Sequence, residues 1–256
     1  MSHTPRIRIF AGPNGSGKSC FNTMIAPRLL GVYINADEIE KKIKAGSELD
    51  FHDFNVNPDS HSFIEFLSHH PVLKKSAIAA DVIARLSLRG SILHLNGVVF
   101  DSYLASAISD YIRQQLLEAR VSFTFETVMS DRSKIELLAQ AREKGYRVYV
   151  YYIATDDAEI NVSRVEARYR GGGHGVAPTK IRERYKRSLD LLVDAIRLSD
   201  RAFIFDNSGI PGGQVWLAEI TDSQELEIKS SELPDWFNGA VLEKFGIDAS
   251  TLDQGR

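Results

Sequence analysis

The chain has 256 residues, 43% of them hydrophobic and 25% charged, and its formal net charge at pH 7 is −3. These values are ordinary for a globular protein, and the small negative charge provides no general attraction to nucleic acid or to an anionic membrane. The single cysteine, Cys20, excludes an internal disulfide and a multi-cysteine zinc site, and it suits a reducing compartment. No apolar run approaches the roughly 20 residues of a membrane span, and the N-terminus lacks the apolar segment of a signal peptide. We therefore expect a cytoplasmic protein.

The first half of the chain alternates strand-like and helix-like segments. Residues 6–11 have an apolar pattern typical of a strand and lead directly into a glycine-rich loop, after which residues 20–30 predict a helix. Residues 32–36 predict a second, short strand. From about residue 40 to residue 97 the sequence combines turn residues with short helical stretches, which indicates an insertion of helices and loops.

The second half continues this alternation. Strands are expected at residues 122–127, 146–154 and 201–206. Helices are expected at residues 100–119, 133–144, 157–169 and 178–198. Residues 214–229 predict a hairpin within a C-terminal extension of about residues 211–256. This alternation predicts an α/β fold with a parallel sheet flanked by helices, as in P-loop NTPases and kinases, in a single domain over residues 1–256.

Residues 12–19, Gly-Pro-Asn-Gly-Ser-Gly-Lys-Ser, match the phosphate-binding pattern G-x-x-x-x-G-K-[ST] between a strand and a helix. In such a loop the backbone N–H groups surround a phosphate, and the dipole of the following helix adds to the attraction. Lys18 would bridge the outer phosphates of ATP, and the Ser19 hydroxyl would ligate Mg²⁺. The alternative, a glycine-rich turn that binds nothing, is disfavoured by the flanking strand and helix. The predicted nucleotide-binding residues are Gly12, Pro13, Asn14, Gly15, Ser16, Gly17, Lys18 and Ser19.

Acidic residues follow two of the predicted strands. Asp37 comes after the second strand, where ligands bind in a parallel sheet, and its carboxylate could accept the proton of an acceptor hydroxyl. Alternatively, Asp37 caps the next helix. Glu126 and Thr127 end the third strand, where they could contact the acceptor or a magnesium-bound water. The alternative for Glu126 is a structural carboxylate paired with a basic side chain.

A basic segment around a Gly-Gly-Gly sequence predicts a mobile lid. Arg164, Arg168 and Arg170 precede the glycines at residues 171–173, and His174 follows them. Closure of the lid would bring guanidinium groups to the transferring phosphate. This gives Arg164 and Arg168 a catalytic role and gives Arg170 and His174 contacts with the acceptor. The alternative is a solvated helical face whose arginines pair with nearby carboxylates.

Taken together, these segments resemble the zeta-toxin family of P-loop kinases, in its chromosomal, stand-alone branch. The matching segments, in the order expected for that family, are residues 11–19, 35–39, 123–127, 172–176, 181–188 and 205–209. The resemblance implies an ATP-dependent phosphotransferase that acts on a hydroxyl of a small molecule. The best-known family activity is 3′-phosphorylation of UDP-N-acetylglucosamine and related UDP-sugars. The resemblance also implies an antitoxin protein as a partner that occupies the nucleotide site.

By position in these motifs, Asp37 takes the place of the family's general base and Glu126 that of the acceptor-binding carboxylate. Arg164 takes the place of a lid arginine that stabilises the transferring phosphate. The resemblance implies a second lid arginine further along, for which this sequence offers Arg168 or Arg170.

Other interpretations of the same loop remain open. The segment at residues 40–97 is longer than the family leads us to expect, so the acceptor could differ from a UDP-sugar. Related P-loop folds phosphorylate antibiotics, other metabolites or polynucleotide 5′-hydroxyls, although a net charge of −3 does not favour a nucleic-acid groove. A nucleotide-dependent switch with slow ATP hydrolysis is an alternative of a different class, and it would need the loop but no acceptor base such as Asp37.

Overall fold

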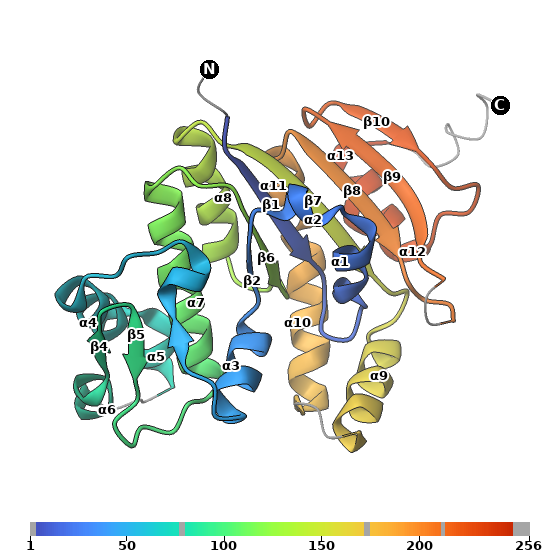
Figure 1. The fold of residues 1–256 in the computed structure, drawn as a ribbon. Helices are drawn as coiled ribbons and strands as arrows, with labels where there is room; N and C mark the ends of the chain where they lie inside the picture. The colour runs from blue at the N-terminus through green and yellow to red at the C-terminus, as the bar shows by residue number, and fades with distance from the viewer. Residues whose placement is uncertain (1–3, 77–79, 172–174, 211–212, 248–256) are drawn as a thin grey trace. The chain divides into compact units, whose positions relative to one another are not determined.

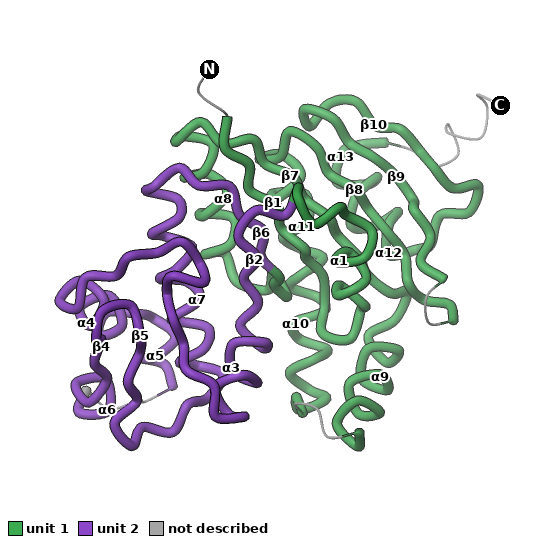
Figure 2. The backbone as a smooth tube through the Cα atoms, in the orientation of Figure 1, with its two compact units in different colours: residues 1–29, 126–256 green, residues 30–125 purple. Residues whose placement is uncertain are grey.

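The computed structural model describes residues 4–76, 80–171, 175–210 and 213–247. The chain divides into two compact units, one made of residues 1–29 and 126–256 and the other of residues 30–125 (Figure 2). Within the described residues, none of the helices combines the length and the hydropathy needed to cross a bilayer.

The main sheet is mostly parallel. Its strands are β1 (Arg6–Ala11), β2 (Val32–Ile34), β6 (Phe123–Thr127), β7 (Arg147–Ala154), β8 (Arg201–Asp206), β9 (Val215–Thr221) and β10 (Glu225–Ile228). They follow the order β10-β9-β8-β7-β1-β6-β2 (Figure 1). The pairs β1–β7, β7–β8 and β2–β6 are parallel, whereas β8–β9 and β9–β10 are antiparallel. This seven-stranded sheet with its helices confirms the predicted P-loop kinase-like α/β fold.

In the first unit, the buried core lies between strands of the main sheet and the helices that pack against them. Val148 and Val150 of β7 and Ile204 of β8 are fully buried, and the helices α8 (Ser133–Glu143) and α11 (Leu192–Arg197) pack against β7. Two further helices, α9 (Ala158–Arg170) and α10 (Pro178–Asp190), pack against each other. The C-terminal helical segment comprises α12 (Asp235–Phe237), a π-helical turn (Asn238–Leu242) and α13 (Glu243–Phe245).

The carboxyl ends of three parallel strands meet at one edge of this sheet. Ala11, the last residue of β1, pairs with Tyr152 near the end of β7, and Ala154 pairs with Asp206 at the end of β8. The loops that leave these strands therefore start close together. In open parallel sheets this is the edge at which ligands bind.

The helix predicted over residues 20–30 is broken in the structure. A 3₁₀ turn (Lys18–Cys20) and the short helix α1 (Phe21–Met24) precede α2 (Pro27–Leu30), and between them Ile25 is extended, with φ −107° and ψ 129°. Pro27 explains why one helix cannot continue through this segment, because proline lacks the N–H that would bond the carbonyl of Thr23 and disfavours a helical conformation in Ala26. The prediction of one continuous helix is therefore wrong, whereas β1 and β8 have the predicted bounds.

The second unit is built around α7 (Ser102–Glu118). This helix contacts α3 (Ala36–Lys44), α4 (Ser60–His69) and α5 (Pro71–Lys75), while α6 (Ala80–Arg85) contacts α4. The ring of Tyr111 lies 5.9 Å from that of Phe51 and 5.1 Å from that of Phe63, so aromatic packing fills the space between these elements. Phe51 belongs to a 3₁₀ turn (Phe51–Phe54).

A small antiparallel sheet completes the second unit. Its strands β3 (Leu49–Asp50), β4 (Ser87–Arg89) and β5 (Ile92–His94) follow the order β3-β5-β4. The prediction of helices and loops over residues 40–97 missed this sheet. Strands of two or three residues are too short to show the alternation by which a strand is recognised in sequence.

Candidate nucleotide-binding site

The glycine loop begins directly at the end of β1 and needs glycine at its first position. Gly12 has a φ of 143°, and a Cβ atom there would lie 2.0 Å from the carbonyl oxygen of Ile153 on β7. Side chains other than hydrogen are therefore excluded at this position. The loop passes through two more positive-φ glycines and ends in the 3₁₀ turn that starts at Lys18.

The side chain of Lys18 lies across the loop. Its Nζ atom donates hydrogen bonds to the carbonyl oxygens of Gly12 and Pro13, both at 2.8 Å. These contacts place the ammonium group over the start of the loop, where the predicted role requires it to meet phosphate oxygens. Ser19 follows in the 3₁₀ turn with an exposed side chain, as a residue that ligates Mg²⁺ in this motif must have.

Several buried polar atoms next to the loop have no partner within the part of the chain that the structure describes. They are Asn14 Oδ1, Ser16 Oγ, Asn161 Nδ2 and Asn207 Oδ1. Unpaired buried polar atoms cost about 1–3 kcal/mol each, so a group of them around one loop indicates a polar ligand or its water. Ser16 Oγ and Asn161 Nδ2 can donate to a phosphate oxygen, whereas Asn14 Oδ1 and Asn207 Oδ1 can only accept, for example from water. The glycine conformations, the position of Lys18 and the two potential donors fit a bound nucleotide phosphate.

Glu126 lies beside the helix that follows the glycine loop. Asn22, on α1, donates from Nδ2 to Glu126 Oε1 at 3.3 Å. Neither side chain is fully buried. Glu126 thus accepts a hydrogen bond from an amide, and its carboxylate lies within the same unit as the loop.

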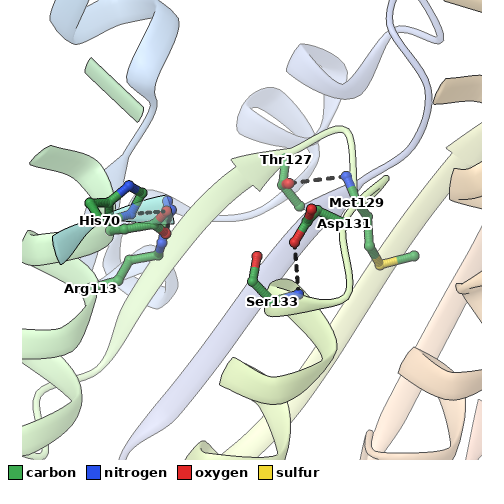
Figure 3. A network of polar contacts seen from close by, with 7 residues as sticks. His70, Arg113, Thr127, Met129, Asp131 and Ser133 are labelled. Carbon is green, nitrogen blue, oxygen red and sulfur yellow. Dashed lines mark hydrogen bonds and ion pairs between the residues drawn. The ribbon is translucent and has the colours of Figure 1, made fainter. Parts of the chain in front are cut away.

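The segment after β6 is held in a strained conformation. The N–H of Met129 donates to Thr127 Oγ1 at 3.0 Å (Figure 3), and the buried Met129 has a φ of 52°, which is rare for a residue with a side chain. Ser188 of α10 donates from Oγ to the carbonyl oxygen of Val128 at 2.7 Å. The Thr127 oxygen thus has a structural role, and its hydroxyl hydrogen can still be donated to a substrate.

Arg164 is bound to the segment that follows β8. Its Nη1 donates to the carbonyl oxygen of Asn207 at 2.7 Å and its Nη2 to that of Gly209 at 2.9 Å. Arg168 and Arg170 are exposed in the last turns of α9. His174 lies outside the described residues. The predicted contacts of these four residues with phosphate or acceptor stay predictions.

Asp37 belongs to the second unit, in the exposed first turn of α3. The cap of this helix is Asn35, whose Oδ1 accepts from the backbone N–H of Asp37 at 3.0 Å and from that of Glu38 at 3.3 Å. The capping role that the sequence offered Asp37 is therefore wrong. The Asp37 carboxylate does not cap the helix, and it is therefore available for the predicted role of general base.

A buried charged network in the second unit was not predicted. Asp110 on α7 pairs with Arg113 one turn later, and its Oδ2 lies 3.3 Å from Nε2 of His70 (Figure 3). His70 and Arg113 are buried. The Arg113 guanidinium lies 4.8 Å from the ring centre of Phe125, the residue before Glu126. Only the i,i+3 spacing of Asp110 and Arg113 could have indicated this network.

Comparison with known proteins identifies the family. The family model described as zeta toxin matches residues 75–210, just over half of the chain. The chain belongs to the zeta toxin family. The matched range includes Glu126 and Arg164 but not the glycine loop, so the assignment of the loop rests on its own sequence and geometry.

A curated relative is matched over part of its length. An uncharacterized protein of Haemophilus influenzae is 33% identical over 69 residues, which are 27% of this chain and 49% of the relative. The chain thus matches about half the length of that curated relative.

Solved structures support the zeta toxin fold. A complex of AvrRxo1-ORF1 and -ORF2 with ATP matches with a TM-score of 0.52 and 15% identity, over 95% of this chain and 64% of that one. The PezAT chromosomal toxin–antitoxin system of Streptococcus pneumoniae matches with a TM-score of 0.50 and 13% identity, over 99% of this chain and 83% of that one. At these identities the likeness concerns the fold.

Proposed function

We propose that this zeta toxin family member transfers the γ-phosphate of ATP to a hydroxyl group of a small molecule. The observation that carries the proposal is the glycine loop, in which Lys18 lies across the start of the loop and Ser16 Oγ and Asn161 Nδ2 are buried polar atoms without a partner among the described residues. A structural neighbour crystallised with ATP is consistent with this assignment. Family membership adds the expectation of a kinase.

The loop and its neighbours would bind the donor. Backbone N–H groups of residues 12–19 would surround the β- and γ-phosphates, and Lys18 would bridge their outer oxygens. Ser19 would hold Mg²⁺, which neutralises charge on these phosphates when bound.

The transfer itself needs a base and an oriented acceptor. The acceptor oxygen would bond to the γ-phosphorus as the bond from that phosphorus to the β–γ bridging oxygen breaks and ADP leaves. Asp37 would take the hydroxyl proton, and Glu126 with Thr127 would orient the acceptor. Arg164 and a second lid arginine, Arg168 or Arg170, would stabilise the transferring phosphate, with His174 as a further acceptor contact.

The first acceptor to test is a UDP-N-acetyl sugar, because UDP-N-acetylglucosamine is the best-known acceptor of the family. We also propose an antitoxin protein as a partner. The support is the PezAT neighbour, which is described as a toxin–antitoxin system.

The experiment is a transfer assay with ATP labelled at the γ-phosphate. Wild type, Lys18→Ala and Asp37→Asn are each incubated with UDP-N-acetylglucosamine and, separately, with a fractionated metabolite extract. We expect wild type to label a small molecule and both variants to lose the transfer. Label that appears only in inorganic phosphate would contradict the proposal and would favour a nucleotide-dependent switch.

A further inference from the structure

Asn207 connects the end of β8 to the glycine loop. Its Nδ2 donates to the carbonyl oxygen of Ser16 at 2.8 Å, in a contact that joins residues 191 positions apart. Both residues are buried, Ser16 completely and Asn207 to all but 8%. A Cβ atom at the neighbouring Gly17 would lie 2.4 Å from Asn207 Nδ2, so a side chain there would force the Asn207 amide to shift.

The direction of this hydrogen bond matters for phosphate binding. In a planar trans peptide the carbonyl and the N–H point to opposite sides. A donor fixed on the Ser16 carbonyl therefore also fixes the direction in which the Gly17 N–H points. A phosphate-binding loop requires its N–H groups to turn toward the anion and its carbonyls to turn away and find other donors. Asn207 supplies such a donor.

Asn207 is itself firmly held. Its backbone N–H donates to the carbonyl oxygen of Ala154, the last residue of β7, at 2.8 Å. Its own carbonyl oxygen accepts from Arg164 Nη1 at 2.7 Å, and Arg164 also bonds Gly209 two residues later. The support for the loop therefore comes from a strand of the sheet on one side and from α9 on the other.

We propose that Asn207 is a positioning residue that holds the Ser16–Gly17 peptide in its phosphate-binding orientation, with Arg164 fixing Asn207 in turn. The inference rests on the proposed function, because it deepens the account of the ATP site. It gives Arg164 a role in shaping the loop that is separate from contact with the transferring phosphate.

Two variants test the role of Asn207. Asn207→Ala removes the donor and the side chain, whereas Asn207→Asp keeps the shape but replaces the donating amide with an accepting oxygen. The matched control is Asn96→Gly, which removes another amide that donates to a backbone carbonyl, that of Arg85 at 2.7 Å. Glycine at position 96 tolerates the positive φ of 47° found there.

The first measurement is the dissociation constant for Mg·ATP by calorimetry, together with hydrogen exchange of a peptide that covers residues 12–19 without nucleotide. For both Asn207 variants we expect about tenfold weaker ATP binding, since a buried carbonyl loses its donor, and faster exchange in this peptide. Asn96→Gly should leave both values at the wild-type level. A dissociation constant within about twofold of wild type, with unchanged exchange in both variants, would overturn the proposal.

The role of Arg164 is tested by its kinetic signature. If Arg164 acts through Asn207, Arg164→Ala should raise the KM for ATP and speed exchange over residues 12–19, in addition to the fall in kcat expected from the loss of its contact with the transferring phosphate. A fall in kcat alone, with unchanged KM and exchange, would overturn this part of the inference.

Failure of the inference can be distinguished from failure of the proposed function. Wild type that transfers phosphate while the Asn207 variants bind ATP normally refutes only the inference. Wild type that binds ATP but transfers to no small molecule refutes only the proposed function. The exchange measurement needs neither ATP nor an acceptor, so it decides the positioning role even if wild type binds no nucleotide.

Discussion

At the residue scale, the glycine loop is held by donors from different parts of the chain. Lys18, inside the loop, bonds the carbonyl oxygens of Gly12 and Pro13, and Asn207 bonds that of Ser16. The Pro13 carbonyl oxygen also accepts from the N–H of Ser16 at 3.3 Å, whereas the Ser16 carbonyl oxygen obtains its donor from the distant Asn207. The sequence motif could predict Lys18, but Asn207 is brought to the loop only by the folding of the sheet.

The role of Asp37 can be separated from ATP binding. Because Asn35 closes the helix, Asp37→Asn should leave α3 intact and remove only a proton acceptor. We expect kcat to fall by about 10²- to 10⁴-fold, the usual contribution of a general base, while the dissociation constant for ATP stays unchanged. Steady-state kinetics and calorimetry on the same preparation check this.

Glu38→Gln is the matched control for Asp37→Asn. It neutralises the neighbouring exposed carboxylate in the same first turn of α3 and should leave kcat within about twofold of wild type, as expected for a surface substitution. If both variants lose activity equally, the effect is one of local charge, and Asp37 is not the base.

Cys20 is the only cysteine, so an alkylating reagent modifies the protein at this one thiol. Its rate of alkylation reports on the surroundings of the glycine loop. Burial raises the pKa of the Cys20 thiol above its ordinary value, although a hydrogen bond with the Gln214 side chain partly opposes the shift. At any pH below that raised pKa the reactive thiolate fraction is smaller than in a free cysteine. We therefore expect slow alkylation by iodoacetamide near pH 7.5.

The pH dependence of the alkylation rate shows whether the pKa of Cys20 is raised or lowered. The alkylation rate of folded protein should keep rising at pH values where the rate of a cysteine peptide has already levelled off. Protein unfolded in urea should follow the peptide. A folded-state rate that levels off below the pH at which the peptide does would show that the pKa is lowered.

At the scale of elements, the loop depends on close packing against the residue that follows β8. Gly17→Ala combines two penalties, a φ of 98° that disfavours a side chain and a Cβ position 2.4 Å from Asn207 Nδ2. Gly46 has a φ of 90° and nothing within 4 Å of the same position. Gly46→Ala therefore isolates the conformational penalty, which is about 1–2 kcal/mol.

We expect Gly17→Ala to lower the free energy of unfolding by more than Gly46→Ala and to weaken ATP binding, which Gly46→Ala should not affect. Urea denaturation and nucleotide titration give the two quantities. Equal loss of stability in the two variants, with normal ATP binding, would show that Asn207 and the loop are not in close contact.

The elements that the sequence predicted well are those with a strong pattern of their own. The bounds of β1 and β8 follow from apolar runs next to turn residues, and α7 from one apolar helical face. Residues 20–30 have a helical pattern, but the helix is interrupted because Pro27 lacks the backbone N–H that a continuous helix requires. The strands β3, β4 and β5 exist through pairing with each other, which no local pattern records.

At the scale of the whole molecule, the chain divides into two compact units. The glycine loop, Glu126, Arg164 and Asn207 belong to one unit, and Asp37 with the His70–Asp110–Arg113 network belongs to the other. The sequence could indicate an insertion at residues 40–97 but not these limits, because the second unit also contains α7, β2 and most of β6.

The buried network tests whether the second unit unfolds independently. Asp110→Ala leaves the buried Arg113 and His70 without their shared partner, and loss of one member of a buried pair typically costs about 3–5 kcal/mol. Hydrogen exchange should therefore accelerate mainly over residues 30–125. The exposed pair Arg132–Asp194 provides the control, because Arg132→Ala should cost about 0–1 kcal/mol. An equal acceleration throughout the chain would mean that the two units unfold together.

Calorimetric titration with Mg·ATP tests the central claim most directly, since every assigned role depends on ATP bound at the glycine loop. Wild type should bind one ATP per chain, and Lys18→Ala should bind about a hundredfold more weakly, because the charge-assisted contacts with the outer phosphates are lost. Wild type that binds no ATP in the presence of magnesium, or Lys18→Ala that binds it as tightly as wild type, would contradict the account.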